Sequence, residues 1–286
     1  MKITKDKIIQ VIKNNVSNTK HNNFEVLGFP QEPMWQEPMI GFASGSDPYF
    51  EFLKQDIGDF YWTPKEAFQL KYPKYKVDNN ELTIISLAFP QTEVTKTLQK
   101  KEEIEPTPRW IATRGEWETL MEELCTNIVK DLGTLGIQVV AIDLLPELCW
   151  LTSEKYGMAA KWSHRHSAYA AGLGTFGLSD GLITKKGKAM RFTTFIVKEQ
   201  IEPDKREYEK YNEWCLFYKD GTCGACIGRC PAGAISKQGH DKQKCSEYED
   251  TIKERLIKEG KMNPKYIGSC GICQSKVPFQ DGIPIK

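Results

Sequence analysis

The sequence from Cys215 to Pro231 reads CLFYKDGTCGACIGRCP, and its cysteine spacing decides how the rest of the chain is interpreted. The core of this stretch, Cys-x2-Cys-x3-Cys-Pro, is most of the bacterial ferredoxin run Cys-x2-Cys-x2-Cys-x3-Cys-Pro. Closely spaced cysteines on a tight loop can direct several thiolates at one cluster. Small residues such as Gly224 and Ala225 let backbone amides approach the sulfurs. We therefore predict a ferredoxin-like pair of clusters.

The ferredoxin rule predicts one complete 4Fe–4S site. In two-cluster ferredoxins the cysteine before proline ligates the cluster opposite to that of its neighbours. Further cysteines follow that proline, and a charged helix between Ser246 and Glu259, with Gly260 as its terminator, would space them. The four ligands predicted for this site are Cys230, Cys245, Cys270 and Cys273.

The second predicted site is incomplete. It takes Cys215, Cys223 and Cys226, but Asp220 and Val277 stand where a ferredoxin has its first and last cysteines. Phe279 cannot act as a ligand either. The fourth ligand is left open, with a three-iron cluster as an alternative, and the candidates are Asp281, Asp220, Cys149 and Cys125.

Structural zinc is the competing interpretation. Two Cys-x2-Cys pairs can bind zinc, but here they lie farther apart than in a zinc ribbon. Zinc would also leave Cys215, Cys230 and Cys245 without a role. Iron–sulfur clusters are therefore favoured over zinc, and a zinc-stabilised binding module is the weakest of the functional hypotheses.

Composition predicts a cytoplasmic protein. The chain has 286 residues and a net charge of +1, so no strong field favours nucleic acid or a membrane. No signal peptide or long apolar run is visible, and we expect no membrane association. Of nine cysteines, all but Cys125 and Cys149 lie between Cys215 and Cys273, which suits a metal site in a reducing compartment.

We place a domain boundary near residue 205, where the composition turns charged and then cysteine-rich, giving domains 1–204 and 205–286. Apolar periodicity predicts helices near 8–16, 117–128 and 162–171, the second opened by a capping box of Thr113 and Glu116. Residues 28–50 are expected to form an ordered loop. Strands are expected at 82–89, 137–142 and 192–197. This alternation indicates a layered α/β or α+β domain.

A glycine stretch follows the third predicted helix. Gly172, Gly174 and Gly177 match G-x-G-x-x-G, but a dinucleotide loop should follow a strand and open a helix. A turn that closes a helix and approaches some ligand is favoured. Polar groups near it predict a pocket for an anion or for proton transfer, with Cys125 in the core and Lys185, Lys186 and Lys188 in a solvated turn. The pocket candidates are His164, Arg165, His166, Trp110, Thr113 and Arg114.

Three stretches carry a resemblance to a known family: RHSAYAAGLGTFGLSDGLIT (165–184), GTCGACIGRCPAGAI (221–235) and CGICQ (270–274). The chain resembles the epoxyqueuosine reductase and reductive dehalogenase superfamily, and is most similar to its short epoxyqueuosine reductase-like proteins. The resemblance implies an α+β fold in which a nitroreductase-like, cobalamin-binding domain precedes a two-cluster ferredoxin module. It implies cobalamin in the pocket, with Trp110, Arg114, Arg165, Gly172, Gly174 and Gly177 as binding residues.

The chain also departs from that family. Met158 stands where epoxyqueuosine reductases have an acid taken as the proton donor. We expect no C-terminal helical-repeat region and no twin-arginine leader, and hence no tRNA partner. The resemblance supports the fold and the clusters more than queuosine chemistry.

Two functions compete. We favour an enzyme that takes electrons from ferredoxin or flavodoxin, passes them through the clusters and reduces cobalamin, which then acts on a small-molecule or corrinoid substrate. The proton would come from His164, His166 or Tyr169. The alternative is a non-catalytic electron carrier or activator that reduces a corrinoid or another redox partner.

Overall fold

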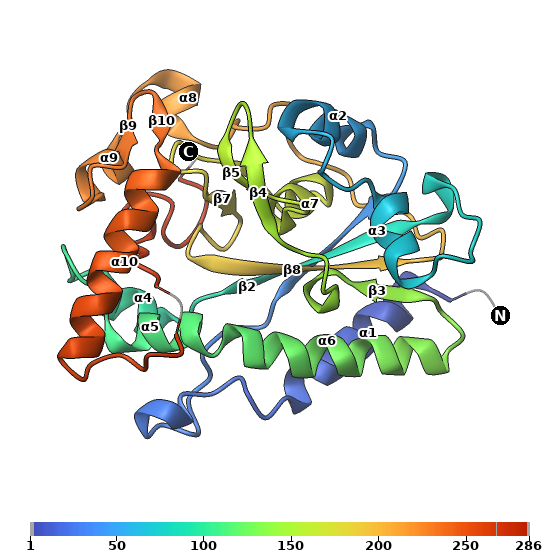
Figure 1. The fold of residues 1–286 in the computed structure, drawn as a ribbon, viewed down its shortest axis with the longest axis horizontal. Helices are drawn as coiled ribbons and strands as arrows, with labels where there is room; N and C mark the ends of the chain where they lie inside the picture. The colour runs from blue at the N-terminus through green and yellow to red at the C-terminus, as the bar shows by residue number, and fades with distance from the viewer. Residues whose placement is uncertain (1–2, 267, 285–286) are drawn as a thin grey trace.

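An antiparallel sheet of four strands forms the centre of the computed structural model, which describes residues 3–266 and 268–284. Its spatial order is β1-β2-β8-β3, and every neighbouring pair is antiparallel (Figure 1). The architecture is therefore α+β. The strands are β1 (Met39–Ser44), β2 (Thr83–Pro90), β8 (Met190–Val197) and β3 (Val139–Ala141).

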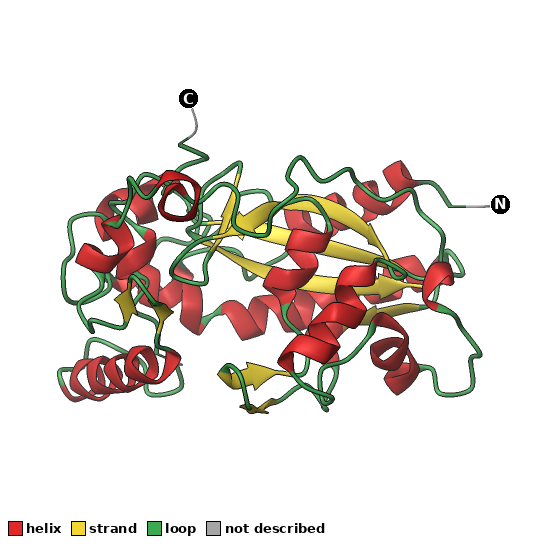
Figure 2. Cartoon of the chain, turned by 90° about the horizontal axis from the view of Figure 1, so that it is seen from above, coloured by secondary structure: helices red, strands yellow, loops and turns green. Residues whose placement is uncertain are grey.

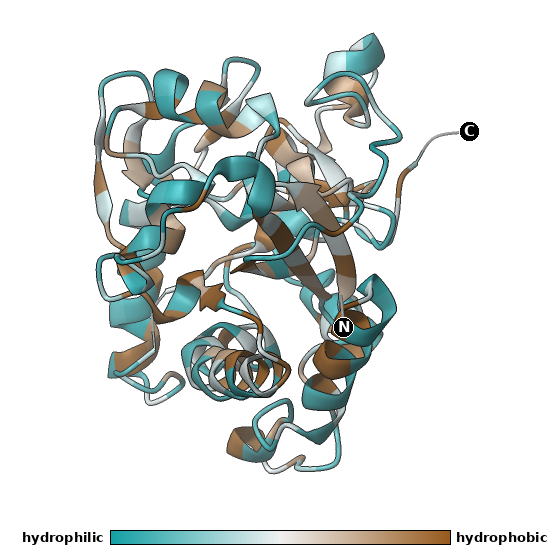
Figure 3. Ribbon diagram, turned by 90° about the vertical axis from the view of Figure 1, so that its right-hand side faces the viewer, coloured by the Kyte–Doolittle hydropathy of each residue, from teal (hydrophilic) through white to brown (hydrophobic). Residues whose placement is uncertain are grey.

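Helices cover both faces of this sheet, so the central strands are apolar on both sides (Figure 3). Alternate residues of a strand point to opposite faces. Ile85 and Phe195 pack beneath α1 (Lys5–Asn18) and α6 (Trp117–Thr134). Ile84 and Ile196 pack on the other face, against the side chains of α2 (Pro48–Ile57), α3 (Pro64–Lys71) and α7 (His164–Ala170).

The remaining elements cluster near one end of the sheet (Figure 2). Two hairpins, β4–β5 and β6–β7, flank α7 in sequence, and the cysteine segment supplies three helices and a small hairpin. Their bounds are α4 (Glu93–Gln99), α5 (Pro108–Gly115), β4 (Trp150–Ser153), β5 (Gly157–Ala160), β6 (Gly174–Phe176), β7 (Leu182–Thr184), α8 (Leu216–Asp220), α9 (Ala225–Arg229), β9 (Ile235–Ser236), β10 (Gly239–His240) and α10 (Lys242–Lys258). Short 3-10 helices occupy Glu25–Leu27, Asn79–Glu81, Ile142–Leu144 and Ile272–Gln274.

The strands and helices expected from periodicity are confirmed, with three corrections. Residues 28–50 contain β1, whose six residues are flanked by prolines that obscured the pattern. Thr113 does not cap a helix: it lies inside α5, which Thr107 caps, and its hydroxyl donates to the carbonyl of Trp110. The third correction concerns β3, which has only three of the six residues expected.

The cysteine segment packs onto the first part of the chain through specific contacts. The Gln99 amide donates to the carbonyl of Cys270 at 3.1 Å, and Arg229 donates to the carbonyl of Glu102 at 2.7 Å. Ile252 and Leu256 of α10 pack with Ile111 of α5. The boundary near residue 205 stays a prediction, because the two parts share these contacts. Among the described residues, no helix is both long and apolar enough to cross a membrane.

Candidate iron–sulfur and redox site

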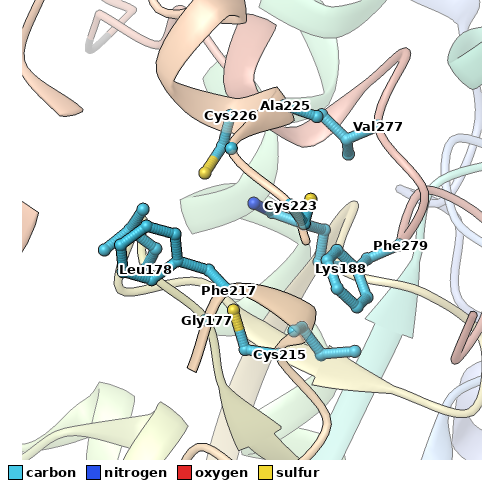
Figure 4. Close-up of a pocket in the computed structure, with 12 residues that line it drawn as sticks. Gly177, Leu178, Lys188, Cys215, Phe217, Cys223, Ala225, Cys226, Val277 and Phe279 are labelled. Carbon is cyan, nitrogen blue, oxygen red and sulfur yellow. The ribbon is translucent and has the colours of Figure 1, made fainter. Parts of the chain in front are cut away.

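Three predicted cluster ligands line one pocket. Cys215 precedes α8 as its N-cap, Cys223 lies two residues before α9, and Cys226 lies within α9. The sulfur atoms of the three side chains point toward the pocket (Figure 4). Three short turns thus bring together thiols that are up to eleven positions apart in the sequence. The other lining residues are mostly apolar: Gly177, Leu178, Ile183, Lys188, Phe217, Gly224, Ala225, Val277 and Phe279.

The other four predicted ligands form a second set. Burial raises the pKa of Cys245 to about 12, with further contributions from nearby Glu249, Cys273 and Cys230. Burial likewise raises the pKa of Cys270, which neighbours Cys273 and Cys245. These thiols influence one another because they lie close together. Such thiols ionise readily only when a metal supplies positive charge, and the amide of Ala234 already points at Cys230 Sγ at 3.3 Å.

The two cysteine sets adjoin each other. Burial raises the pKa of Cys226, and the neighbouring thiols that add to this effect include Cys273 of the second set as well as Cys215 and Cys223. In the part of the chain that the structure describes, no three His, Cys, Asp or Glu side chains converge tightly enough to hold a single ion.

None of the four open candidates for a further ligand lines the three-cysteine pocket. Asp281 pairs with Lys96 at 2.6 Å, and Asp220 accepts from the amide of Thr222 at 2.9 Å. Cys125 is fully buried in the core, as predicted, and Cys149 is exposed.

Lys188 corrects one prediction. Lys185 is exposed, as expected of a solvated turn, but Lys188 is only 5% exposed. Its ammonium donates to Ser179 Oγ at 2.6 Å and reaches into the three-cysteine pocket (Figure 4). Sequence reasoning missed it because neighbouring lysines and Gly187 made the stretch resemble a surface turn.

The glycine stretch forms a hairpin, and the dinucleotide interpretation is wrong, as its context indicated. Gly172 ends α7 with φ of 77°, a left-handed conformation that favours glycine. Gly174 begins β6, where a Cβ would lie 2.2 Å from the carbonyl oxygen of Ile183. Gly177 lines the three-cysteine pocket. The turn thus approaches the pocket of Cys215, Cys223 and Cys226.

His164 lies in a polar group at the edge of the sheet. Its Nδ1 is 2.9 Å from Thr194 Oγ1 and its Nε2 is 3.5 Å from Asp143 Oδ1. Asp143 also accepts from Thr193 Oγ1 at 2.5 Å. Because β3 ends at Ala141, Thr193 and Thr194 of β8 are paired only on the β2 side, and Asp143 lies on the side that β3 leaves free.

Arg191 extends this polar group toward the second cysteine set. Its Nε is buried and has no hydrogen-bond partner. Burial lowers the pKa of Arg191 to about 9, and nearby Arg114 lowers it further, opposed by Glu118, Glu249 and Asp143. Glu249 accepts from the amide of Cys270 at 3.0 Å. Charged groups therefore extend from His164 to the loop that carries Cys270 and Cys273, which we call the cluster loop.

Sequence reasoning missed Asp143, Arg191 and Glu249. The available signals were an acid directly after the apolar run 137–142 and a lone arginine inside the strand MRFTTFIV. Arg114, which was predicted, pairs with Glu118 beside Arg191. Trp110 lies elsewhere, packed against Gly271 of the cluster loop.

The other predicted residues do not converge with His164. His166 Nδ1 is 2.7 Å from Ser163 Oγ, and its ring lies 4.7 Å from that of Phe176. The ring of Tyr169 stacks at 4.7 Å from that of Tyr49. Arg165 donates to the backbone carbonyl of Asp180. His164 is thus the only predicted proton donor that shares the polar group with Arg191.

His166 should give the fold a pH dependence. Burial lowers the pKa of His166 to about 3, whereas an unfolded histidine titrates near 6.5. Between these values the unfolded chain binds the extra proton, so stability falls as the pH falls, by up to about 1.4 kcal/mol per pH unit. We would measure this loss of stability by comparing the denaturation midpoints of the wild type and of His166→Asn at pH 7 and at pH 5. The variant should lose less stability than the wild type. Equal losses in both proteins would contradict it.

Comparisons with known proteins agree with this geometry. Residues 221–280 match the model of the 4Fe-4S double cluster binding domain. An epoxyqueuosine reductase of Leadbetterella byssophila is 33% identical over 162 residues, which cover 54% of this chain and 44% of that protein. The match thus spans less than half the length of that curated relative.

Solved structures share the fold at low identity. An epoxyqueuosine reductase bound to an epoxyqueuosine-modified tRNA stem loop matches with a TM-score of 0.53 and 17% identity, over 99% of this chain and 66% of that one. The epoxyqueuosine reductase of Bacillus subtilis matches with a TM-score of 0.51 and 16% identity, over 97% of this chain and 67% of that one.

A catabolic reductive dehalogenase in complex with 3-bromo-4-hydroxybenzoic acid also matches. Its TM-score is 0.52 at 14% identity, over 86% of this chain and 30% of that one. The likeness expected from the sequence is confirmed: the chain carries a C-terminal 4Fe–4S double cluster binding domain on the fold of the epoxyqueuosine reductases and reductive dehalogenases.

Proposed function

We propose that this protein is an iron–sulfur oxidoreductase whose two cysteine sets hold clusters that deliver electrons to a reaction site at His164. The observation that carries the proposal is a group of half-buried charged residues: His164 faces Asp143, the charges of Asp143 and Glu249 act on Arg191, and Glu249 accepts from the amide of Cys270. The Nε atom of Arg191 is buried without a partner, which is costly unless a ligand satisfies it. An anionic or carbonyl-bearing ligand would do so.

Cobalamin fits the surroundings of this site. A corrin ring needs exposed apolar surface, and the hairpin β4–β5 presents Trp150, Leu151 and Met158, with Trp150 64% exposed. The hairpin lies against the cluster domain, where Lys242 donates to the carbonyl of Met158 at 3.1 Å. These residues would hold the corrinoid, which supplies low-potential cobalt for reductive chemistry when bound. His164 is then the group placed to give a proton.

The proposed partners follow from charge and chemistry. A ferredoxin or flavodoxin supplies the electrons, and the substrate is a small molecule or a corrinoid. A relative of the same fold binds a tRNA stem loop. With a net charge of +1 this chain lacks the basic excess that phosphate-backbone binding uses, so we propose no tRNA partner here.

Cofactor binding tests the proposal. Anaerobically reconstituted protein should contain iron and sulfide, and titration with cob(II)alamin should change its visible spectrum. Trp150→Ser should weaken this binding roughly tenfold, the loss expected for about 1.4 kcal/mol of apolar contact. Leu135→Ser, which changes an exposed apolar residue after α6, should leave corrinoid binding unchanged. Absence of iron or of corrinoid binding in the wild type would overturn the proposal.

Variants of the polar group separate an enzyme from a simple carrier. Arg191→Gln and His164→Asn should keep both clusters but weaken corrinoid binding by roughly ten- to a hundredfold, because a hydrogen bond to a charged group contributes about 1.5–3 kcal/mol. Arg255→Gln, which removes an exposed arginine that pairs with Glu105, serves as the control. If both variants left corrinoid binding and reduction unchanged, the carrier function would be the better description.

A further inference from the structure

We propose that the pocket of Cys215, Cys223 and Cys226 holds a three-iron cluster, with Phe279 standing where a fourth iron and its thiolate would be. The proposal rests on the cluster assignment made above and extends it to the type of cluster. Three thiols line the pocket, and among the described residues no other sulfur, carboxylate or imidazole does. In ferredoxins a fourth cysteine of the protein holds the fourth iron, and the described lining supplies none.

Phe279 is the lining residue best placed to occupy the position of the fourth iron and its ligand, which we call the fourth corner of the cluster. It is 5% exposed and packs in the same apolar cluster as Cys215, Cys223 and Cys226, whereas Val277 lies outside that cluster. Figure 4 shows its ring at the pocket beside Lys188. An aromatic ring fills roughly the space that a ligand and its iron would need, and it cannot bind iron.

The segment that carries Phe279 is held in place. The amide of Lys188 donates to the carbonyl of Phe279 at 2.9 Å. At Gly187 a Cβ would lie 2.0 Å from the carbonyl oxygen of Gln280, so two backbones touch there. The Gln280 side chain in turn accepts from the amide of Lys276 at 2.7 Å. A rearrangement that brings Asp281 to the pocket would break these contacts as well as its ion pair with Lys96.

Lys188 suits the charge of such a cluster. An oxidised three-iron core carries one positive charge, and three thiolates bring the total to two negative charges. The ammonium of Lys188 reaches into the pocket with only a neutral hydroxyl, Ser179 Oγ, as its hydrogen-bond partner. Burying an unpaired cation is unfavourable, and a dianionic cluster would supply the missing counter-charge.

Spectroscopy of the whole protein tests the cluster type. Protein prepared without oxygen and then oxidised by one equivalent of ferricyanide should show the near-isotropic EPR signal of an oxidised three-iron cluster. It should contain one iron fewer than two 4Fe–4S clusters require. Full iron content without that signal would overturn the inference but leave the proposed function standing. Iron-free protein would overturn both the inferred cluster type and the proposed function.

Two variants locate the corner. Phe279→Cys should supply the missing thiolate, abolish the three-iron signal and raise the iron content by one. Val277→Cys tests the competing placement, because Val277 lines the same pocket and stands at the position of the last ferredoxin cysteine; it should leave the signal in place. Loss of the signal in Val277→Cys alone would overturn the placement at Phe279.

The wild type gives an independent measurement if Phe279→Cys fails to fold. Dithionite should reduce the three-iron cluster by one electron, but added Fe²⁺ should not convert it to a 4Fe–4S core, because the Phe279 ring fills the fourth corner. Reoxidation by ferricyanide should then return the full three-iron signal. Loss of that signal through uptake of Fe²⁺ would contradict the inference.

Discussion

Replacing Gly271 with alanine should destabilise the protein strongly. Gly271 has φ of 61°, and a Cβ there would lie 2.1 Å from the indole of Trp110, which is 3% exposed and cannot move aside. The left-handed backbone and the overlap together should cost roughly 2–5 kcal/mol. The melting temperature should then fall by about 2–4 °C per kcal/mol.

The same substitution should release iron, since Gly271 directly follows the predicted ligand Cys270. Iron content per chain and the melting temperature of the holo-protein are the measurements. Gly228→Ala is the matched control: it lies between Cys226 and Cys230, where a Cβ would meet nothing within 4 Å. Equal effects of the two substitutions would show that the contact with Trp110 does not matter.

Replacing Lys188 with methionine should lower the reduction potential of the cluster in the three-cysteine pocket. The Lys188 ammonium opposes the effect of burial on the pKa of Cys226 and also acts on Cys273, so it lies near both cysteine sets. Loss of a buried positive charge disfavours the added electron. A tenfold change in a one-electron equilibrium is about 59 mV, and we expect a decrease of roughly that size or more.

A redox titration followed by EPR measures this decrease. Lys185→Met provides the control, because Lys185 is exposed and pairs with Glu207 at 2.7 Å in solvent. Its removal should shift the potential little, since exposed charges are screened. An unchanged potential in Lys188→Met, with both clusters intact, would mean that Lys188 does not compensate the cluster charge.

The cysteine spacing predicted how the ligands are grouped, because cluster ligands on tight loops are near neighbours in sequence as well as in space. The ferredoxin rule assigns Cys226 and Cys230, only four positions apart, to different clusters, and of the two only Cys226 lines the three-cysteine pocket. Periodicity likewise predicted α10, whose Ile252 and Leu256 repeat at helical spacing and are buried. Such patterns are local, so a single sequence contains them.

The redox site beyond the clusters could not be predicted in this way. His164 was found from its neighbours in sequence, but Asp143 and Arg191 join it only because β3 stops after three residues and exposes the edge of β8. His166 and Tyr169 are close to His164 in the chain, yet they face different surroundings. Neighbours on a helix of this kind point in different directions, and no pattern in the sequence states which direction meets the sheet edge.

The sequence by itself determined the 4Fe–4S binding domain and the main strands, since each depends on residue type and short-range spacing. Only the tertiary structure decided which wall completes the three-cysteine pocket and that Lys188 is buried in it. Those outcomes depend on the C-terminal segment packing beside Gly187, about ninety positions earlier in the chain. Contacts between distant segments arise from the packing of the whole molecule, which short-range patterns do not encode.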